Sequence, residues 1–221
     1  MHISDFYQEL DQLFRTNQID RVEPFLLQQI VAANQERDPS AVLAVLNELV
    51  GFYRSQKRYD EAIRVAHQAL DLCGHEYILG SIAHATTLLN GATAYRFSGQ
   101  PEKAMEWFLQ AEEIYREKLS PADEHYAGLY NNMSAACSDL GQNDRAAEYL
   151  QRAAAIMDAL PERAVQAAVT HANLASLYAK LQRWDEAKEQ IARACALLQD
   201  RPEAAAQYAQ FRAMQDVFAR Y

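Results

Sequence analysis

The chain has 221 residues, half of them hydrophobic, and a formal net charge of −9 at pH 7. This acidic balance argues against nucleic acid or an anionic membrane surface as a partner, because both require a basic stripe. No apolar run approaches the roughly 18 residues of a membrane-spanning helix. The N-terminal MHISDFYQEL also lacks the apolar core of a signal peptide.

Helices are expected throughout, because only seven Gly and six Pro interrupt a sequence rich in Ala, Leu, Gln and Glu. Proline in a first turn predicts helix starts at Pro39, Pro121, Pro161 and Pro202, with Asp38, Ser120 and Asp200 as caps. One further start is expected near Gly74-His75-Glu76. In chain order we expect a single domain over 1–221, made of a degenerate hairpin over 3–35, hairpins over 39–73, 76–119, 121–159 and 162–199, and a capping helix over 202–220.

An alanine pair recurs about every 42 residues, on the second helix of each predicted hairpin. The pairs are Ala62/Ala69, Ala104/Ala111, Ala146/Ala153 and Ala187/Ala194, and the residue nine before each is Tyr53, Tyr95, Cys137 or Tyr178. Residues seven apart lie on one face of a helix, so these alanines should let paired helices approach closely. A fixed period of this size predicts stacked helical hairpins. Gly99 and Gly141, in the turns between paired helices, are expected to supply left-handed helix ends.

The repeated residues resemble those of tetratricopeptide repeats. The match is carried by Leu174, Ala175, Tyr178, Trp184, Ala187, Ile191 and Ala194, by Ala92, Tyr95, Gly99, Ala104, Phe108 and Ala111, and by Ser134, Gly141, Ala146, Leu150 and Ala153. The repeat is longer than the usual 34 residues and resembles the kinesin light chain type. This resemblance implies an all-α, right-handed superhelical solenoid, in which the first helix of each hairpin lines a concave groove.

The C-terminal helix carries Tyr208, Phe211, Met214, Val217 and Phe218 on one face. Stacked repeats need a terminal helix with a polar outer side, so capping is the leading interpretation. Dimerisation, or occupation of the groove by this helix, stays open.

Family geometry projects one set of side chains from the first helices into the groove. They are Tyr7, Gln8, Asp11, Arg15, Glu48, Arg54, Thr86, Asn90, Thr93, Arg96, Asn131, Asn132, Ser138, Asn173, Ser176 and Lys180. Asn90, Asn132 and Asn173 form a ladder, one per repeat. An amide offers both donor and acceptor, so it can hold the backbone of an extended peptide. The alternative is that these amides bond to neighbouring helices or face water.

Two narrower hypotheses concern the same positions. Family members that clamp a C-terminal carboxylate use cations around the central Asn, but here those positions hold Leu89, Thr93, Val169 and Asn173, so that clamp is excluded. A basic row of Arg15, Arg54 and Arg96 could favour an acidic peptide, or these arginines could be solvated or paired.

Neither catalysis nor metal binding is predicted. The histidines show no i, i+4 pair and are expected at helix ends and on the surface, and no nucleophile, phosphate or metal motif occurs. The three cysteines, Cys73, Cys137 and Cys195, are an odd number on distant repeats and are interpreted as reduced core residues of a cytoplasmic protein.

The sequence thus predicts a non-enzymatic scaffold, without cofactor, that binds a peptide or partner protein. The predicted binding residues are Asn90, Asn131, Asn132, Asn173, Arg54, Arg96, Thr93, Ser176 and Lys180. The alternatives are a self-associating structural oligomer, or a peptide-responsive regulator that acts through another protein.

Overall fold

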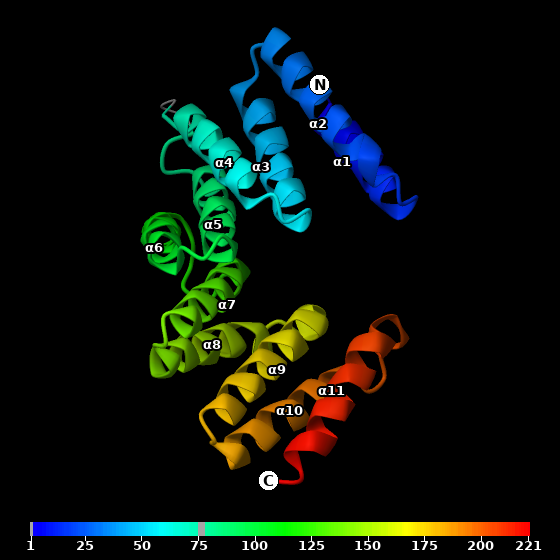
Figure 1. Ribbon diagram of the computed structural model, residues 1–221, viewed down its shortest axis with the longest axis vertical. Helices are drawn as coiled ribbons and strands as arrows, with labels where there is room; N and C mark the ends of the chain where they lie inside the picture. Colours follow the sequence, from blue (N-terminus) through cyan, green and yellow to red (C-terminus); the bar gives the residue numbers. More distant parts are fainter. Residues whose placement is uncertain (1, 75–77) are drawn as a thin grey trace. The chain divides into compact units, whose positions relative to one another are not determined.

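The computed structural model describes residues 2–74 and 78–221, which form α-helices and two short 3-10 turns, with no strand among them. The chain separates into two compact units, residues 1–118 and 119–221, and the single domain expected from the sequence stays a prediction. Each unit is described by itself (Figure 1).

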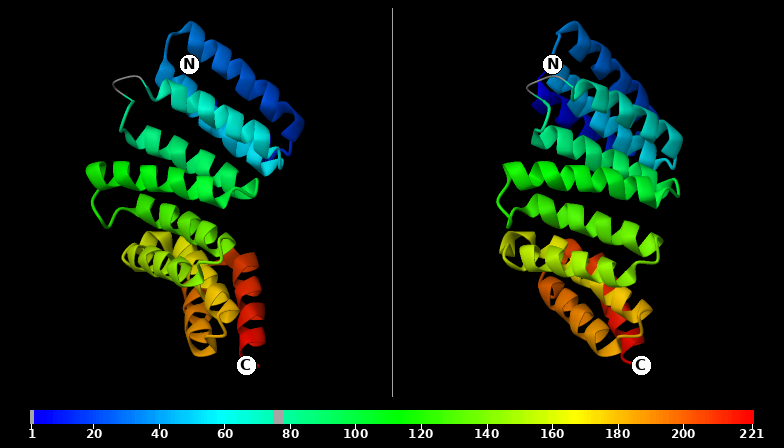
Figure 2. Two further views of the ribbon diagram at one scale, coloured as in Figure 1. Left: turned by 60° about the vertical axis from the view of Figure 1, so that its left-hand side comes forward. Right: turned by 90° about the vertical axis from the view of Figure 1, so that its left-hand side faces the viewer.

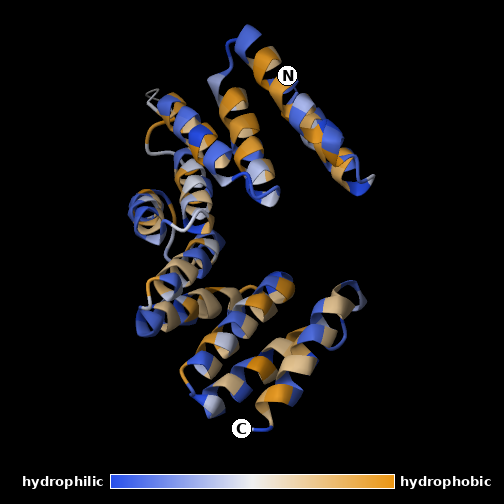
Figure 3. Ribbon diagram, in the orientation of Figure 1, coloured by the Kyte–Doolittle hydropathy of each residue, from blue (hydrophilic) through white to orange (hydrophobic). Residues whose placement is uncertain are grey.

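Unit 1 is a stack of antiparallel helices in which each helix packs on the next (Figure 2). Its helices are α1 (Ile3–Arg15), α2 (Ile19–Gln35), α3 (Pro39–Ser55), α4 (Tyr59–Leu72), α5 (Ile82–Phe97) and α6 (Pro101–Lys118). The first helices α3 and α5 also touch each other. Helix α3 lies deepest, with nine buried residues, and is mostly hydrophobic along its length (Figure 3).

Unit 2 repeats this arrangement and ends in an extra helix. Its elements are α7 (Glu124–Asp139), α8 (Asn143–Asp158), a 3-10 turn (Pro161–Arg163), α9 (Ala164–Lys180), α10 (Trp184–Leu198), a second 3-10 turn (Pro202–Ala204) and α11 (Ala205–Phe218). Consecutive helices pack against each other from α7 to α11.

The packing role of the repeated alanines is confirmed. All eight are fully buried, and the residues nine positions earlier, Tyr53, Tyr95, Cys137 and Tyr178, are buried as well. Because protein interiors are close-packed, a larger side chain at these positions is expected to overpack the helix pair. At Gly91 on α5 the helices leave no room even for a methyl, since an added Cβ would lie 2.2 Å from Cζ3 of Trp107 on α6.

The turns between paired helices contain a left-handed residue. Gly99 and Gly141 take it at φ of +79° and +74°, as predicted. Lys57 and Gln182 adopt the same conformation, at φ of 59° each, although they are not glycine. The turn geometry is therefore kept across the repeats even where the residue that favours it is absent.

The predicted helix starts are confirmed only in part. Asp38 caps α3 as predicted, since its carboxylate accepts from the Ala41 N–H at 3.0 Å. The expected caps Ser120 and Asp200 are wrong: Asp123 caps α7 by accepting from the His125 N–H, and Pro161 and Pro202 open 3-10 turns. The start expected at Gly74-His75-Glu76 lies partly outside the described residues, and α5 begins at Ile82 behind the cap Ser81.

The last helix covers α10. Phe211 and Phe218 of α11 are buried, and Trp184 at the start of α10 stacks on Tyr221 with ring centroids 4.0 Å apart. Val217, expected on the same face, is 46% exposed. The three cysteines are buried and unpaired, as the sequence predicted.

Candidate peptide-binding site

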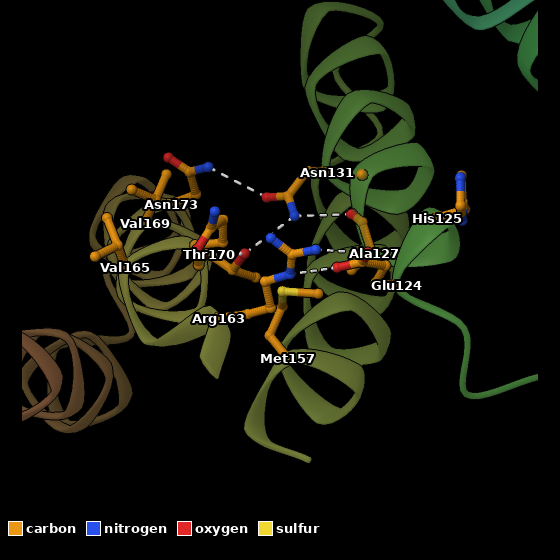
Figure 4. Close-up of a pocket in the computed structure, with 12 residues that line it drawn as sticks. Glu124, His125, Ala127, Asn131, Met157, Arg163, Val165, Val169, Thr170 and Asn173 are labelled. Atoms are coloured by element: carbon orange, nitrogen blue, oxygen red, sulfur yellow. Dashed lines mark hydrogen bonds and ion pairs between the residues drawn. The ribbon is translucent and has the colours of Figure 1, made fainter. Parts of the chain in front are cut away.

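A pocket of about 560 Å³ opens in unit 2 where α7 and α9 run beside each other (Figure 4). Its apolar wall comes from Ala127, Met157, Val165 and Val169. Val169 is 40% exposed, which is unusual for a valine inside a helical stack. Gly128 also lines the pocket, and a Cβ built there would meet no atom within 4 Å. The pocket can therefore accept an aliphatic side chain.

An ion pair closes one edge of this pocket. Arg163 reaches from the 3-10 turn to Glu124 at the start of α7, with Nε 2.5 Å from Oε2 and a second hydrogen bond of 2.8 Å (Figure 4). The two-pronged pair fixes the entry of α9 against α7. The carboxylate of Glu124 also raises the pKa of Arg163.

Amides on the opposite edge form a cluster that we call the unit 2 clasp, made of Asn131, Thr170 and Asn173. Asn131 Nδ2 donates to Thr170 Oγ1 at 3.1 Å and to the Ala127 carbonyl at 2.9 Å. Asn173 Nδ2 donates to Asn131 Oδ1 at 3.3 Å. The clasp joins the two first helices directly beside the apolar wall.

Unit 1 carries the same arrangement between α3 and α5, made of Asn47, Thr87 and Asn90. Asn47 Nδ2 donates to Thr87 Oγ1 at 3.0 Å, and Asn90 Nδ2 donates to Asn47 Oδ1 at 3.2 Å. Sequence reasoning missed Asn47, Thr87 and Thr170. The signal for them was a recurrence two repeats apart, since Asn47, Thr87 and Asn90 match Asn131, Thr170 and Asn173 in order and nearly in spacing.

The predicted asparagine ladder has two kinds of member. Asn90 and Asn173 each donate to the preceding first helix, which is the alternative that the sequence left open. Asn132 donates to the Gly128 carbonyl of its own helix at 2.9 Å. Among the described residues, none donates a hydrogen bond to Oδ1 of these three asparagines, so each keeps a free acceptor. Their role in binding stays a prediction.

The other predicted residues differ in what they can offer a ligand. Thr93 is only 6% exposed and donates to the Leu89 carbonyl, so little of it can touch a ligand. Ser176 is exposed and donates to the Ala172 carbonyl. Lys180 Nζ is held by Ser138 Oγ at 3.1 Å and Asn143 Oδ1 at 3.0 Å.

The three arginines of the predicted basic row in unit 1 lie in different environments. Arg15 is paired with Asp11 at 3.0 Å on the surface of α1. Arg54 is half-buried, and burial lowers its pKa. Arg96 lies over the ring of Phe97, 4.9 Å from its centroid.

A second pocket, of about 430 Å³, lies in unit 1 beside the Asn47–Thr87–Asn90 cluster. Tyr7 of α1, Glu48 of α3 and Thr86 of α5 line it. Burial raises the pKa of Glu48, and burial followed by the charge of Glu48 raises the pKa of Tyr7. A neighbouring pocket of about 460 Å³ shares Tyr7 and Glu48 and continues along α1.

The histidine prediction needs one correction. His171 is 1% exposed on α9, not on the surface, because it fills the space between three helices. Its Nδ1 lies 2.7 Å from Oε1 of Gln190 on α10, and its Nε2 lies 2.8 Å from Oδ1 of Asp158 on α8. Both ring nitrogens are thus used in joining helices.

The described residues contain no group of three or more His, Cys, Asp or Glu placed to hold a metal ion. Across residues 2–74 and 78–221, no helix combines the length and apolar character needed to cross a membrane.

Comparison with known proteins supports the repeat pattern. Tetratricopeptide repeat models match residues 41–117 and 127–156. No curated protein sequence matches the chain.

Solved structures share the fold at low sequence identity. The structure of BtubC (BKLC) from P. vanneervenii is similar with a TM-score of 0.78 and 21% identity, covering 88% of this chain and 79% of that one. Two structures of a putative kinesin light chain with nearly identical TPR-like repeats from Podosopora anserina, one of them a point variant, are 19% identical. Their TM-scores are 0.72 for the variant and 0.70 for the other, and each comparison covers 93% of this chain and 96% of that one. The family models thus identify tetratricopeptide repeats within residues 41–117 and 127–156, and the solved structures share the fold of the chain.

Proposed function

We propose that this protein is a non-catalytic interaction module that binds an extended peptide segment of a partner protein on its first helices. Tetratricopeptide repeats indicate a scaffold for protein–protein interaction. The observation that carries the finer proposal is the pairing, in unit 2, of an apolar pocket with amides beside it.

The two parts of this site suit the two parts of a peptide. Successive side chains of an extended peptide point in opposite directions. One peptide side chain can therefore enter the pocket and contact Val165, Val169 and Met157, while the peptide backbone passes over the asparagine amides. The acceptors of Asn132 and Asn173 can take backbone N–H groups without reading the peptide sequence. Apolar contact would then supply affinity, and the asparagines would orient the backbone.

We also propose a cytoplasmic location. The proposal is supported by three unpaired, buried cysteines, which suit a reducing compartment.

The test uses the full-length protein and a phage library of random 12-residue peptides. We expect wild type to enrich peptides with an aliphatic residue at one position. The double variant Asn132→Ala with Asn173→Ala should bind the best peptide about 30-fold more weakly, because each of the two lost hydrogen bonds is worth roughly 1 kcal/mol. Gly128→Leu should also weaken binding, since its side chain would extend into the open pocket.

A matched control is available on α2. Asn34 is exposed and donates to the Ile30 carbonyl four residues earlier, as Asn132 does to Gly128, but its helix α2 lines none of the three described pockets. Asn34→Ala should leave peptide affinity unchanged. If the double variant kept both the peptide affinity and the melting curve of wild type, the asparagine ladder would not bind the peptide backbone. Failure of wild type to enrich any peptide would contradict the proposed function itself.

Self-association is the second candidate, and one surface favours it. Leu27 and Val31 stand one turn apart on α2 and are 47% and 58% exposed. Two such side chains on one helix face form a small apolar surface that a second copy could cover. Light scattering over a wide concentration range tests this, and a constant monomer mass would rule it out.

A further inference from the structure

Glu48 stands at a repeat position that holds asparagine elsewhere. Counted from the tyrosine or cysteine of the repeat, Asn90, Asn132 and Asn173 occupy this position in the following repeats. The structure places Glu48 on α3 in the wall of the unit 1 pocket, half-buried and next to Asn47. One repeat therefore presents a carboxylate where the others present an amide.

This carboxylate has no partner within the described part of the chain. Other acids of unit 1 are held by arginines: Arg58 pairs with both Glu23 and Glu61. Glu48 makes no such pair, although burial removes part of its hydration, as its raised pKa reflects. A partly desolvated carboxylate without a counter-charge gains strongly from an incoming cation.

Tyr7 supplies a second feature suited to a cation. Its side chain is 44% exposed and shares both unit 1 pockets with Glu48. The charge of Glu48 contributes to the raised pKa of Tyr7, so the two groups act on each other electrostatically. An aromatic face beside a carboxylate favours an ammonium or guanidinium group.

The adjoining pocket gives room for a long side chain. Besides Tyr7 and Glu48 it is lined by Gln8, Leu10, Asp11 and Phe14 of α1, and Asp11 is already paired with Arg15. The aliphatic stem of lysine or arginine can lie along such a partly apolar channel while its charged end reaches the carboxylate. The net charge of −9 also attracts basic segments.

We propose that this Glu48–Tyr7 pocket binds a lysine or arginine side chain of an extended peptide and so gives unit 1 a preference for basic ligands. The inference rests on the proposed function, because it assigns a specificity to peptide binding.

The experiment is a double-mutant cycle between the protein and peptides selected from the random library. Wild type should enrich Lys or Arg at one peptide position, and Glu48→Gln should lose that enrichment. For the best peptide, replacing its basic residue with Met should weaken binding to wild type about tenfold, as expected for a hydrogen-bonded ion pair. The same replacement should leave binding to Glu48→Gln almost unchanged.

Glu9→Gln is the matched control, because Glu9 is an exposed acid of α1 that lines neither pocket of unit 1. It removes the same charge and should keep the preference for Lys and Arg. Melting curves verify that each variant is folded. Enriched peptides without a preference for Lys or Arg would overturn this inference alone. Enrichment of Asp and Glu would also overturn it, and would instead support the prediction that Arg54 and Arg96 favour an acidic peptide. No enriched peptide at all would overturn the proposed function as well.

Discussion

Gly91 has no side chain, and this lets α5 and α6 pack closely at that point. A Cβ there would lie 2.2 Å from Cζ3 and 2.7 Å from Cε3 of Trp107, which is itself packed edge-on against Tyr95 and His67. A tryptophan held on several sides cannot move away without losing these contacts. Gly91→Ala should therefore lower the free energy of unfolding by about 1–3 kcal/mol, although alanine is the better helix former. Urea unfolding curves measure this.

Gly128 provides the opposite case on α7. No atom lies within 4 Å of its Cβ position, so Gly128→Ala should raise the free energy of unfolding by about 0.5–1 kcal/mol through helix propensity alone. If the two alanine variants changed stability alike, the contact between Gly91 and Trp107 would not be what limits the helix distance.

The asparagines show how far residues can be interpreted without a structure. Their repeat position was visible in the sequence, and so was the possibility that they bond to neighbouring helices. Which asparagine does so depends on the distance between neighbouring first helices: Asn90 donates to Asn47, and Asn173 donates to Asn131. Asn47 and Asn131 donate in turn to Thr87 and Thr170, which lie on the following first helix. Sequence spacing does not contain that distance. Likewise, it gave no sign that His171 would be buried between Asp158 and Gln190.

Among elements, α2, α3 and α4 are tied together by one polar network at the turn after α3. Tyr53 donates to Glu23 Oε1 at 2.8 Å, and the guanidinium of Arg58 lies 4.3 Å from the Tyr53 ring centroid while bonding to Glu23 and Glu61. Burial, followed by the hydrogen bond to Glu23, raises the pKa of Tyr53 to about 12. This network makes stability depend on pH in the alkaline range.

The direction of that dependence follows from the raised pKa. An unfolded tyrosine ionises near pH 10, so the contribution of Tyr53 is complete below pH 10 and is lost as the pH rises to about 12. Between those limits the urea midpoint of wild type should fall more steeply than that of Tyr53→Phe. Tyr208→Phe on α11 controls for loss of a hydroxyl elsewhere. If the urea midpoints of wild type and Tyr53→Phe fell in parallel as the pH rises, the network would not raise the pKa of Tyr53.

The elements themselves were largely predictable, because their signals are local. The alanine period and the glycine turns follow from packing and backbone sterics within one hairpin. Helix starts were predicted less well: Asp123 and Ser81 cap their helices, whereas the sequence suggested Ser120 and a start near Gly74. Several residues near each start can cap, and only the path of the incoming chain decides between them.

At the scale of a whole unit, α11 covers the last helix pair of unit 2. Each helix of that unit packs on the next, and α11 covers α10 in the same way through Phe211, Phe218 and the stacking of Trp184 on Tyr221. Deleting residues 202–221 should lower the free energy of unfolding by about 3–6 kcal/mol, since two buried phenylalanines each contribute roughly 1.5–3 kcal/mol. Thermal melting and size-exclusion chromatography measure the loss and the resulting aggregation.

The same deletion separates capping from self-inhibition. A point variant, Phe211→Ala with Phe218→Ala, keeps the helix but removes its anchors, and under capping it should also be destabilised. Peptide affinity should then fall or stay constant in both variants, because α11 contributes no side chain to the described pocket between α7 and α9. A truncated protein that remained stable and monomeric while binding peptide more tightly would mean that α11 competes with the ligand for the first helices.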